Sequence, residues 1–351
     1  MFSEARFTQS IRKVAIVGSG LAGLTIGHEL RDRGYQVSLF DKARGPGGRM
    51  SSKRAGEQSI DMGAQYFSIR HQGFRHFLES KAGNASWGIW EGHFQDRDET
   101  GLWRPSSREA RHVGIPRMSA ITRALSRELD VSTRQRIIEL SRTDSERWLI
   151  TSEADGSLER EEHGEFDAVL LTAPVQQCRD LLNNSALASL ADELNRPDFE
   201  LQPCWAVALH FSGDAEFPTD GGKLEHPVLG WVANNSSKAG RQEEGEGQWL
   251  VLHATAEWSE RNREASAEDV IREMTASFLD IIQAEQQPDQ SLAHRWLYAK
   301  AGRAGAGSFW WPEHRLGVAG DWLNGGRVEA AWESATDLVG RLTGWAPDKS
   351  G

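Results

Sequence analysis

The stretch KVAIVGSGLAGLTIGHELRDRGYQVSLFD, residues 13–41, decides the fold class of this chain. Its pattern predicts a buried strand, an amphipathic helix that ends at Gly34, and a second apolar strand that ends in an acid. Gly18 permits the tight turn after the first strand, Gly20 lets the backbone approach a pyrophosphate, and Gly23 lets the helix pack closely on the strand. Because strand, helix and acid are all in register with the glycines, the pattern is far more specific than three glycines alone.

The same stretch predicts how an adenine dinucleotide is held. The helix is expected to begin at about Leu21, so the free N–H groups of its first turn, at Leu21 and Ala22, face the phosphates together with the positive end of the helix dipole. Asp41 follows the second strand, where its carboxylate can accept hydrogen bonds from both hydroxyls of a ribose. The sequence therefore predicts a domain that binds an adenine dinucleotide.

A second loop rich in glycine and arginine, residues 42–50, follows directly. Such a loop has no role in a domain that binds only a nicotinamide dinucleotide, so it indicates a second length of extended ligand. Arg44 and Arg49 are the expected cations for the pyrophosphate, since guanidinium groups bind phosphates in bidentate fashion. The ligand contacts expected in this loop are Lys42, Arg44, Gly48, Arg49 and Met50.

The run DKARGPGGRMSSKR at 41–54, with DMGAQYF at 61–67, resembles the FAD-binding half of renalase and its bacterial relatives. These proteins belong to the wider group of flavin amine oxidases and share the hydroxybenzoate-hydroxylase fold. Two C-terminal runs, AHRWLYA at 293–299 and VAGDWLNGGRVEAAWES at 318–334, are similar to the last third of bacterial renalases. The resemblance covers both ends of the chain well and the middle thinly.

The resemblance implies that the dinucleotide is FAD. It implies that the 61–67 loop lies near the flavin, that the backbone at Ile137 lies beside the adenine, and that the strand ending at Thr172 approaches the dinucleotide. From the residues themselves, the strand ending at Gly320 and Asp321 offers a carboxylate to the ribityl hydroxyls. A last helix, beginning near Arg327 or Val328, directs its positive end at the flavin ring. The further cofactor contacts expected are Gly63, Ala64, Gln65, Ile137, Thr172, Ala173, Gly320, Asp321, Arg327 and Val328.

The expected architecture is an α/β chain with a discontinuous, Rossmann-like FAD-binding domain and an antiparallel-sheet α+β substrate domain. The FAD-binding domain is assigned to 1–85, 105–175 and 294–351, and the substrate domain to 86–104 and 176–293. Alternating apolar residues in the middle third indicate the antiparallel strands. Helices are expected at 118–129, with Ser119 as a candidate cap, and outside the second sheet at 177–194 and 267–283.

Composition indicates a cytoplasmic enzyme. The 351 residues suffice for two packed units, and the net charge of −11 argues against nucleic acid as a partner. No apolar run reaches the length of a membrane span, and the first ten residues lack the apolar core of a signal peptide. The two cysteines, Cys178 and Cys204, have no ligand-like spacing, so we expect a reducing compartment and no metal.

The resemblance implies an oxidase of misreduced nicotinamide dinucleotides, which carry hydride at ring position two or six. FAD takes the hydride, NAD(P)+ is released, and O2 is reduced to hydrogen peroxide. Because hydride loss makes the pyridine ring aromatic, no general base is required, and catalysis depends on alignment. The partners expected are thus a dinucleotide substrate and O2, and the catalytic candidates are His253, Gln65, Tyr66 and Arg295.

Several candidates have two interpretations. His253 matches a histidine of the renalase pattern, but it could equally be a satisfied histidine on a sheet face. Arg70, His294 and Arg295 are candidates to bind substrate phosphates. Lys300 resembles the active-site lysine of amine oxidases, but it is interpreted as a solvated lysine. The aromatic candidates for pocket walls are Trp231, Trp258, Trp296 and Trp322.

Two other functional classes stay open. One is a flavin amine oxidase or desaturase acting on a small amine or an apolar substrate. The other is a non-catalytic flavoprotein. The charge of the substrate distinguishes the dinucleotide oxidase from the amine oxidase. A dinucleotide needs cations at the mouth of the pocket, whereas an amine needs a neutral or acidic pocket mouth.

Overall fold

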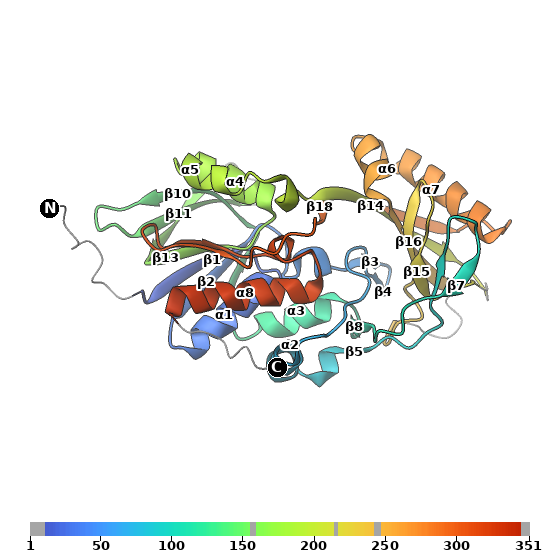
Figure 1. The fold of residues 1–351 in the computed structure, drawn as a ribbon, viewed down its shortest axis with the longest axis horizontal. Helices are drawn as coiled ribbons and strands as arrows, with labels where there is room; N and C mark the ends of the chain where they lie inside the picture. The colour runs from blue at the N-terminus through green and yellow to red at the C-terminus, as the bar shows by residue number, and fades with distance from the viewer. Residues whose placement is uncertain (1–10, 155–158, 214–216, 242–246, 345–351) are drawn as a thin grey trace.

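The computed structural model describes residues 11–154, 159–213, 217–241 and 247–344. Two sheets form the two halves of the molecule (Figure 1). One contains the two strands of the N-terminal stretch 13–41, and the other is built mainly from the middle third of the chain. The first ten residues, considered above for a signal peptide, lie outside the described residues. The two sheets and the helices that cover them confirm the predicted α/β class.

The first sheet has six strands in the order β19-β20-β13-β1-β2-β9. All neighbours are parallel except the edge pair β19 and β20. Because the carboxyl ends of the parallel strands meet at one edge, a ligand is expected at that edge. The strands are β1 (Lys13–Val17), β2 (Gln36–Asp41), β9 (Asp130–Thr133), β13 (Ala168–Leu171), β19 (Phe309–Trp311) and β20 (Leu316–Val318).

Both faces of this sheet are covered, as parallel sheets require. Val14 and Ile16 of β1 pack into one apolar cluster together with helices, and Ala15 packs into another on the opposite face. The first face carries α1 (Leu21–Asp32), α2 (Gln72–Phe77), α3 (Ser119–Ser126) and α8 (Val328–Thr343). The second face carries β10 (Gln135–Arg142), β11 (Trp148–Ala154), β12 (Arg160–Phe166), α4 (Val175–Asn184) and α5 (Ala188–Glu193).

The second sheet is antiparallel, in the order β15-β16-β17-β14-β18. Alternate residues of β14 serve two cores: Val207 packs under the outer helices, while Ala206 packs inward against Met62 of the first domain. The elements are β14 (Gln202–Phe211), β15 (Gly221–Lys223), β16 (Leu229–Asn234), β17 (Gln248–Ala254), α6 (Ala256–Arg261), α7 (Ala267–Ile282) and β18 (Gln290–Lys300).

Short hairpins and turns connect the two halves. The small strands are β3 (Lys53–Ala55), β4 (Gln58–Ile60), β5 (Trp87–Ile89), β6 (Gln95–Arg97), β7 (Trp103–Pro105) and β8 (His112–Gly114). The single-turn helices are η1 (Gly48–Met50), η2 (Leu78–Ala82), η3 (Asn84–Ser86), η4 (Pro197–Phe199) and η5 (Asp321–Leu323).

The structure differs from the sequence-based assignment at two domain boundaries. The helices expected at 177–194 outside the second sheet are α4 and α5, which pack in the core of the first domain (Figure 1). Residues 294–300, assigned to the FAD-binding domain, belong to β18 of the antiparallel sheet. Amphipathic periodicity predicted these elements but says nothing about which sheet buries their apolar side.

The cap expected at Ser119 is also wrong. Ser119 is the first residue of α3, Met118 occupies the capping position, and no side chain caps this helix. No described helix has both the length and the apolar character that crossing a bilayer requires.

Candidate active site

A cleft of about 1000 Å³ lies along the carboxyl edge of the parallel sheet and continues under the antiparallel sheet. This volume is at the upper end of the range for small-molecule sites. Among the predicted cofactor residues, the cleft is lined by Gly18, Gly20, Leu21, Ala22, Asp41, Lys42, Gly48, Arg49, Met50, Gly63, Ala64, Gln65, Ile137, Thr172, Ala173, Gly320, Asp321, Arg327 and Val328. The structure thus brings distant segments together, and their individual contacts with a ligand stay predictions.

The glycines of the first loop occupy distinct environments. Gly18 has a φ of +108°, a backbone conformation that glycine adopts without strain and other residues rarely adopt. A Cβ on Gly23 would lie 2.0 Å from the carbonyl oxygen of Gly18, so Gly23 holds α1 close to β1 and does not line the cleft. A Cβ on Gly20 would meet no described atom within 4 Å. Its open side faces the cleft, where a phosphate can approach the uncapped start of α1.

Asp41 is oriented by its neighbours at the end of β2. One carboxylate oxygen, Oδ2, accepts hydrogen bonds from the Ser19 N–H at 2.7 Å and the Ser19 hydroxyl at 2.6 Å. The other, Oδ1, accepts from the Ala43 N–H at 2.8 Å. A carboxylate has about four lone-pair sites, so it retains acceptor capacity for a ribose hydroxyl in the cleft.

The second glycine-rich loop lies directly against the first. The Gly47 N–H donates to the Ser19 carbonyl at 3.0 Å, and Gly47 has a φ of +141°. Arg49 forms a bidentate ion pair with Asp321, with Nη1 2.9 Å from Oδ2 and Nη2 on Oδ1. This pair ties the second loop to the end of the parallel sheet beside the cleft. Arg49 and Asp321 therefore act on a ligand as a joined pair.

Arg44 corrects the sequence interpretation of this loop. Its side chain is exposed and does not line the cleft, so it is not placed to bind the pyrophosphate. Lys42 does line the cleft, and burial, with a smaller contribution from Arg136, lowers the pKa of its ammonium group. Residue type alone did not separate these two neighbouring cations.

At the far end of the cleft, the backbone at Gly63 packs closely against the backbone at Arg49. A Cβ on Gly63 would lie 2.0 Å from the Arg49 carbonyl oxygen, so only glycine fits there. Helix α8 begins at Val328 after Arg327, and no side chain caps it. The free N–H groups of its first turn and its positive dipole end face the cleft. These groups, the two glycine-rich loops and Asp41 together fit an extended dinucleotide whose ring gains negative charge on reduction, as FAD does.

The antiparallel sheet supplies the other wall of the cleft. Trp231 and Tyr66 pack at 5.4 Å between ring centres, and His294 meets Trp296 edge-to-face at 4.3 Å. His253 lies on β17 with Nε2 3.0 Å from the Met62 carbonyl oxygen. The four predicted catalytic residues, Gln65, Tyr66, His253 and Arg295, all line the cleft.

Both histidines of this wall are neutral at pH 7. Burial, helped by the charge of Lys300, lowers the pKa of His253 to about 4. Burial, helped by Lys53, likewise lowers the pKa of His294 to about 4. His253 therefore donates its Nε2 proton to Met62. His294, expected above as a cation for phosphates, is instead an uncharged hydrogen-bonding group.

Two predicted arginines are engaged elsewhere. The Arg295 guanidinium donates to the Arg263 carbonyl and pairs with Glu264 at 3.0 Å, so its charge is offset. Arg70 pairs with Glu109 at 2.6 Å and lies outside the cleft. Neither arginine is free to hold a substrate phosphate, which corrects both expectations.

Lys300 was interpreted as a solvated lysine, and this is wrong. It is the last residue of β18, is partly buried, lines the cleft, and donates from Nζ to the Ala254 carbonyl at 3.1 Å. Trp258 and Trp322 are buried and do not line the cleft: Trp258 bonds Glu273, and Trp322 bonds the Ala173 carbonyl. Trp231 and Trp296 remain as cleft walls.

Sequence reasoning missed two features of the site. Lys223, an exposed lysine on β15, lines the cleft. The second feature is a pair of buried cations, Lys238 and Arg241, which form ion pairs with Asp61. Lys238 and Arg241 lie in a polar stretch that reads as a surface loop, so no local pattern marked them as interior charges.

Comparison with known proteins agrees with this geometry. A model of the NAD(P)-binding Rossmann-like domain matches residues 16–80, and a model of the flavin containing amine oxidoreductases matches residues 84–342. A protein from Exiguobacterium sp. 255-15, provisionally assigned as a protoporphyrinogen oxidase, has a similar structure: TM-score 0.72, 12% identity, 95% of this chain and 99% of that one. Putrescine oxidase bound to putrescine is similar at a TM-score of 0.67 and 13% identity, over 95% of this chain and 99% of that one.

The curated relatives match over short segments. A 1-hydroxycarotenoid 3,4-desaturase of Flavobacterium sp. (strain P99-3) is 38% identical over 61 residues, which are 17% of this chain and 12% of the relative. A flavin-dependent L-tryptophan oxidase of Lentzea aerocolonigenes is 31% identical over 65 residues, 17% of this chain and 14% of the relative. The matched segments thus span a small part of these relatives, whereas the family model covers most of this chain. With FAD as its cofactor, the chain belongs to the family of flavin containing amine oxidoreductases.

Proposed function

We propose that the protein is an FAD-dependent oxidase of the 2- and 6-dihydro isomers of NAD(P)H. Bound FAD would accept the hydride of the dihydropyridine, which leaves NAD(P)+, and would then pass that hydride, with one proton from solvent, to O2 to give hydrogen peroxide. The observation that carries the proposal is the lining of the cleft on the antiparallel-sheet side. Among its described residues are aromatic and basic side chains and neutral histidines, but no carboxylate.

This lining suits a reaction that needs alignment and no base. The Tyr66–Trp231 pair, whose ring planes are tilted by 33°, offers an aromatic surface against which a pyridine ring can pack. The neutral His253 can accept a hydrogen bond at Nδ1 from the carboxamide N–H of a nicotinamide. Lys223 and Lys300 are the cations on this side that can attract the anionic diphosphate. Because loss of hydride makes the ring aromatic, no proton has to be removed.

The test is anaerobic mixing of the yellow holoprotein with borohydride-treated NAD+, which contains the 2-, 4- and 6-dihydro isomers. We expect the minor isomers to bleach the flavin rapidly and ordinary NADH to leave it oxidised. After air is admitted, hydrogen peroxide should form in a one-to-one ratio with NAD+. Bleaching by simple amines alone would overturn the proposal.

Variants separate alignment from base catalysis. H253A should lower turnover of the active isomer by about tenfold, the size of a lost hydrogen bond, and not by the larger factor of a lost general base. K223M should raise KM several-fold with little change in kcat, since it weakens attraction to the phosphates in ground and transition state alike. A loss of turnover in H253A as complete as that on removing FAD would contradict the base-free mechanism.

Amine oxidation is the second candidate, and Lys300 favours it. Lys300 is a partly buried lysine at the cleft, as in the amine oxidases that the sequence resembles. Against it, a protonated amine would face Lys223 and Lys300 without a carboxylate among the described residues of that wall. Bleaching by a panel of primary amines and diamines at pH 8, with the dinucleotide isomers inert, would establish this candidate instead.

A further inference from the structure

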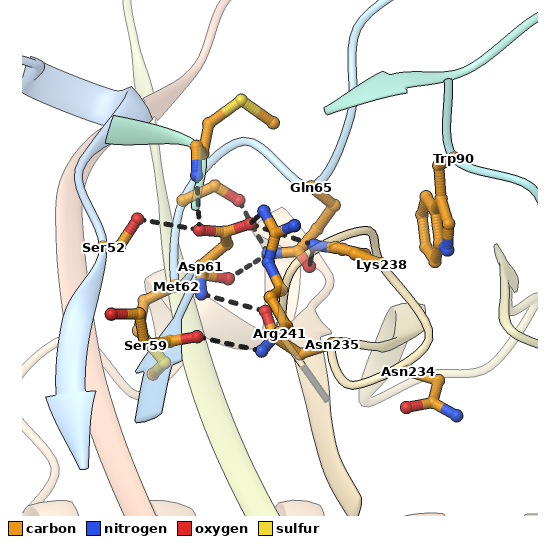
Figure 2. Close-up of polar contacts among 12 residues, drawn as sticks. Ser52, Ser59, Asp61, Met62, Gln65, Trp90, Asn234, Asn235, Lys238 and Arg241 are labelled. Atoms are coloured by element: carbon orange, nitrogen blue, oxygen red, sulfur yellow. Dashed lines mark hydrogen bonds and ion pairs between the residues drawn. The ribbon is translucent and has the colours of Figure 1, made fainter. Parts of the chain in front are cut away.

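A group of charged side chains is buried behind the flavin-facing wall of the cleft. The Asp61 carboxylate has no exposed surface and accepts hydrogen bonds from the Ser52 hydroxyl at 2.7 Å and the Met118 N–H at 2.9 Å. Lys238 and Arg241, from the loop after β16, approach the same carboxylate at 3.3 and 2.5 Å. Figure 2 shows Ser52, Lys238 and Arg241 directed at Asp61, with the Lys238 ammonium beside the side-chain amide of Gln65.

The charges in this group do not balance. When Lys238 is protonated, one carboxylate faces two cations, and the side chains of Lys238 and Arg241 are 0% and 1% exposed. Burying an ion pair rarely stabilises a fold more than apolar residues would, and a second buried cation adds a further desolvation cost. The Asp61–Arg241 pair alone would join the loop after β16 to the first domain. Lys238 therefore calls for a reason other than stability.

Lys238 reaches the cleft through Gln65. Its Nζ donates to Gln65 Oε1 at 3.0 Å, and because an ammonium group has no acceptor, this contact determines which end of the amide faces it. The other end, Nε2, then donates to the backbone carbonyls of Asp61 and of Gly63, the latter at 3.0 Å. Gln65 itself lines the cleft. One cation thus orients an amide that closes the 61–65 turn.

The turn in question supports the opposite wall. The Met62 carbonyl accepts hydrogen bonds from His253 Nε2 at 3.0 Å and from Trp296 Nε1 at 2.9 Å. Asn235, from the same loop as Lys238, accepts the Asp61 N–H at 3.1 Å and donates to the Ser59 carbonyl at 3.1 Å. A displaced 61–65 turn would release both cleft-lining side chains from Met62.

We propose that Lys238 is a positioning residue of the flavin cleft: by fixing the amide of Gln65 it holds the 61–65 turn, and with it His253 and Trp296, in the arrangement that receives the flavin. This inference rests on FAD as the cofactor and not on the proposed substrate. Arg241 pairs with Asp61 without touching Gln65, so it does not share this role.

The groups around Lys238 determine the pKa of its ammonium group. Burial lowers the pKa of Lys238 to about 7, the Asp61 charge opposes this shift and the Arg241 charge adds to it. His253 of β17 faces the same region and is uncharged at neutral pH, and Trp90 lies 5.1 Å away with its ring towards the ammonium group. Asp61 and Arg241 are therefore the charged groups, among the described residues, that face Lys238.

The decisive experiment compares K238M with R241M in the FAD-loaded protein. Each substitution removes one buried cation and leaves one ion pair with Asp61, so both keep a balanced charge. K238M removes the donor to Gln65 and R241M does not. We expect K238M to weaken FAD affinity about tenfold, the size of one charge-assisted hydrogen bond, and to shift the visible absorption bands of bound FAD. R241M should stay within about twofold of wild type.

A double-mutant cycle with Q65L shows whether Lys238 acts through Gln65. Q65L should weaken FAD affinity as much as K238M, and the double variant should add nothing further. Should K238M fail to fold, Q65L carries the test alone. Wild-type affinity and spectrum in either K238M or Q65L would overturn the inference, as would equal losses in K238M and R241M. None of these measurements depends on which substrate reduces the flavin.

Discussion

The environment of a side chain decides its charge more than its residue type does at this site. His294 and Arg295 are neighbours in the sequence and both were candidates to bind phosphate. Burial keeps His294 neutral, and Glu264 offsets the charge of Arg295. His253 is likewise neutral, which suits a hydrogen-bonding role and not that of an acid at pH 7. Whether such a side chain presents a charge to the cleft depends on packing that no local pattern encodes.

The neutral histidines predict acid sensitivity. The pKa of His253 and that of His294 fall from 6.5 to about 4 on folding. Between these values the unfolded chain binds more protons, so the free energy of unfolding should fall as the pH drops from 6.5 towards 4. Urea titrations at half-unit pH steps should show a shallower fall in the H253Q/H294Q variant. The exposed His76 provides a control, and an H76Q curve parallel to that of the double variant would refute the assignment.

At the scale of elements, the fingerprint predicted from sequence appears with small shifts in its boundaries. Helix α1 begins at Leu21 as expected and ends at Asp32, two residues before Gly34. The last helix, expected from Arg327 or Val328 to Leu342, is α8 (Val328–Thr343). These elements are predictable because glycine positions and apolar periodicity act over short distances. The side on which α4 and α5 pack was not predictable, since an amphipathic helix fits any apolar surface.

The glycines of the first loop make a matched pair of tests. In G23A the new Cβ would lie 2.0 Å from the Gly18 carbonyl oxygen. Because this oxygen belongs to the backbone, it cannot move aside as a flexible side chain could. We expect G23A to lose at least about 3 kcal/mol of stability. In G20A the new Cβ would meet no described atom, so stability should change by less than about 1 kcal/mol.

The two variants should differ again in cofactor binding. The methyl group in G20A occupies the approach of the pyrophosphate, so FAD affinity should fall at least tenfold, roughly, while the protein stays folded. Fluorescence titration with FAD and thermal unfolding of the apoprotein measure the two effects separately. Tight FAD binding by G20A would mean that the phosphates lie elsewhere.

At the scale of the whole molecule, the cleft depends on segments from both halves. The two glycine-rich loops, the ends of β13 and β20 and the start of α8 come from the first domain, and the second sheet contributes β17 and β18. The buried group around Asp61 joins the halves beside the cleft (Figure 2). A ligand that touches every segment should therefore stabilise the whole protein.

FAD and FMN provide the comparison for this prediction. Both carry the flavin ring, but FMN lacks the adenylate part that we expect to lie against Asp41 and the backbone at Ile137, which line the cleft. At about 100 times its Kd, FAD should add about 2.7 kcal/mol to the unfolding free energy of the apoprotein and raise Tm by several degrees. FMN at the same concentration should give a much smaller shift. Equal shifts would place the adenylate outside the cleft.

The sequence by itself determined the α/β class and the dinucleotide-binding pattern of residues 13–41, because turns, strand periods and helix starts are local properties of the chain. The resemblance to known flavoproteins implied FAD, and most of the predicted cofactor residues line the cleft. Only the tertiary structure decided that Arg44 points away, that Lys300 enters the cleft, and that Lys238 and Arg241 are buried against Asp61. Asp61 and Lys238 lie 177 residues apart in the chain. Burial and charge pairing between such distant residues arise from packing, and packing leaves no periodic trace in the sequence.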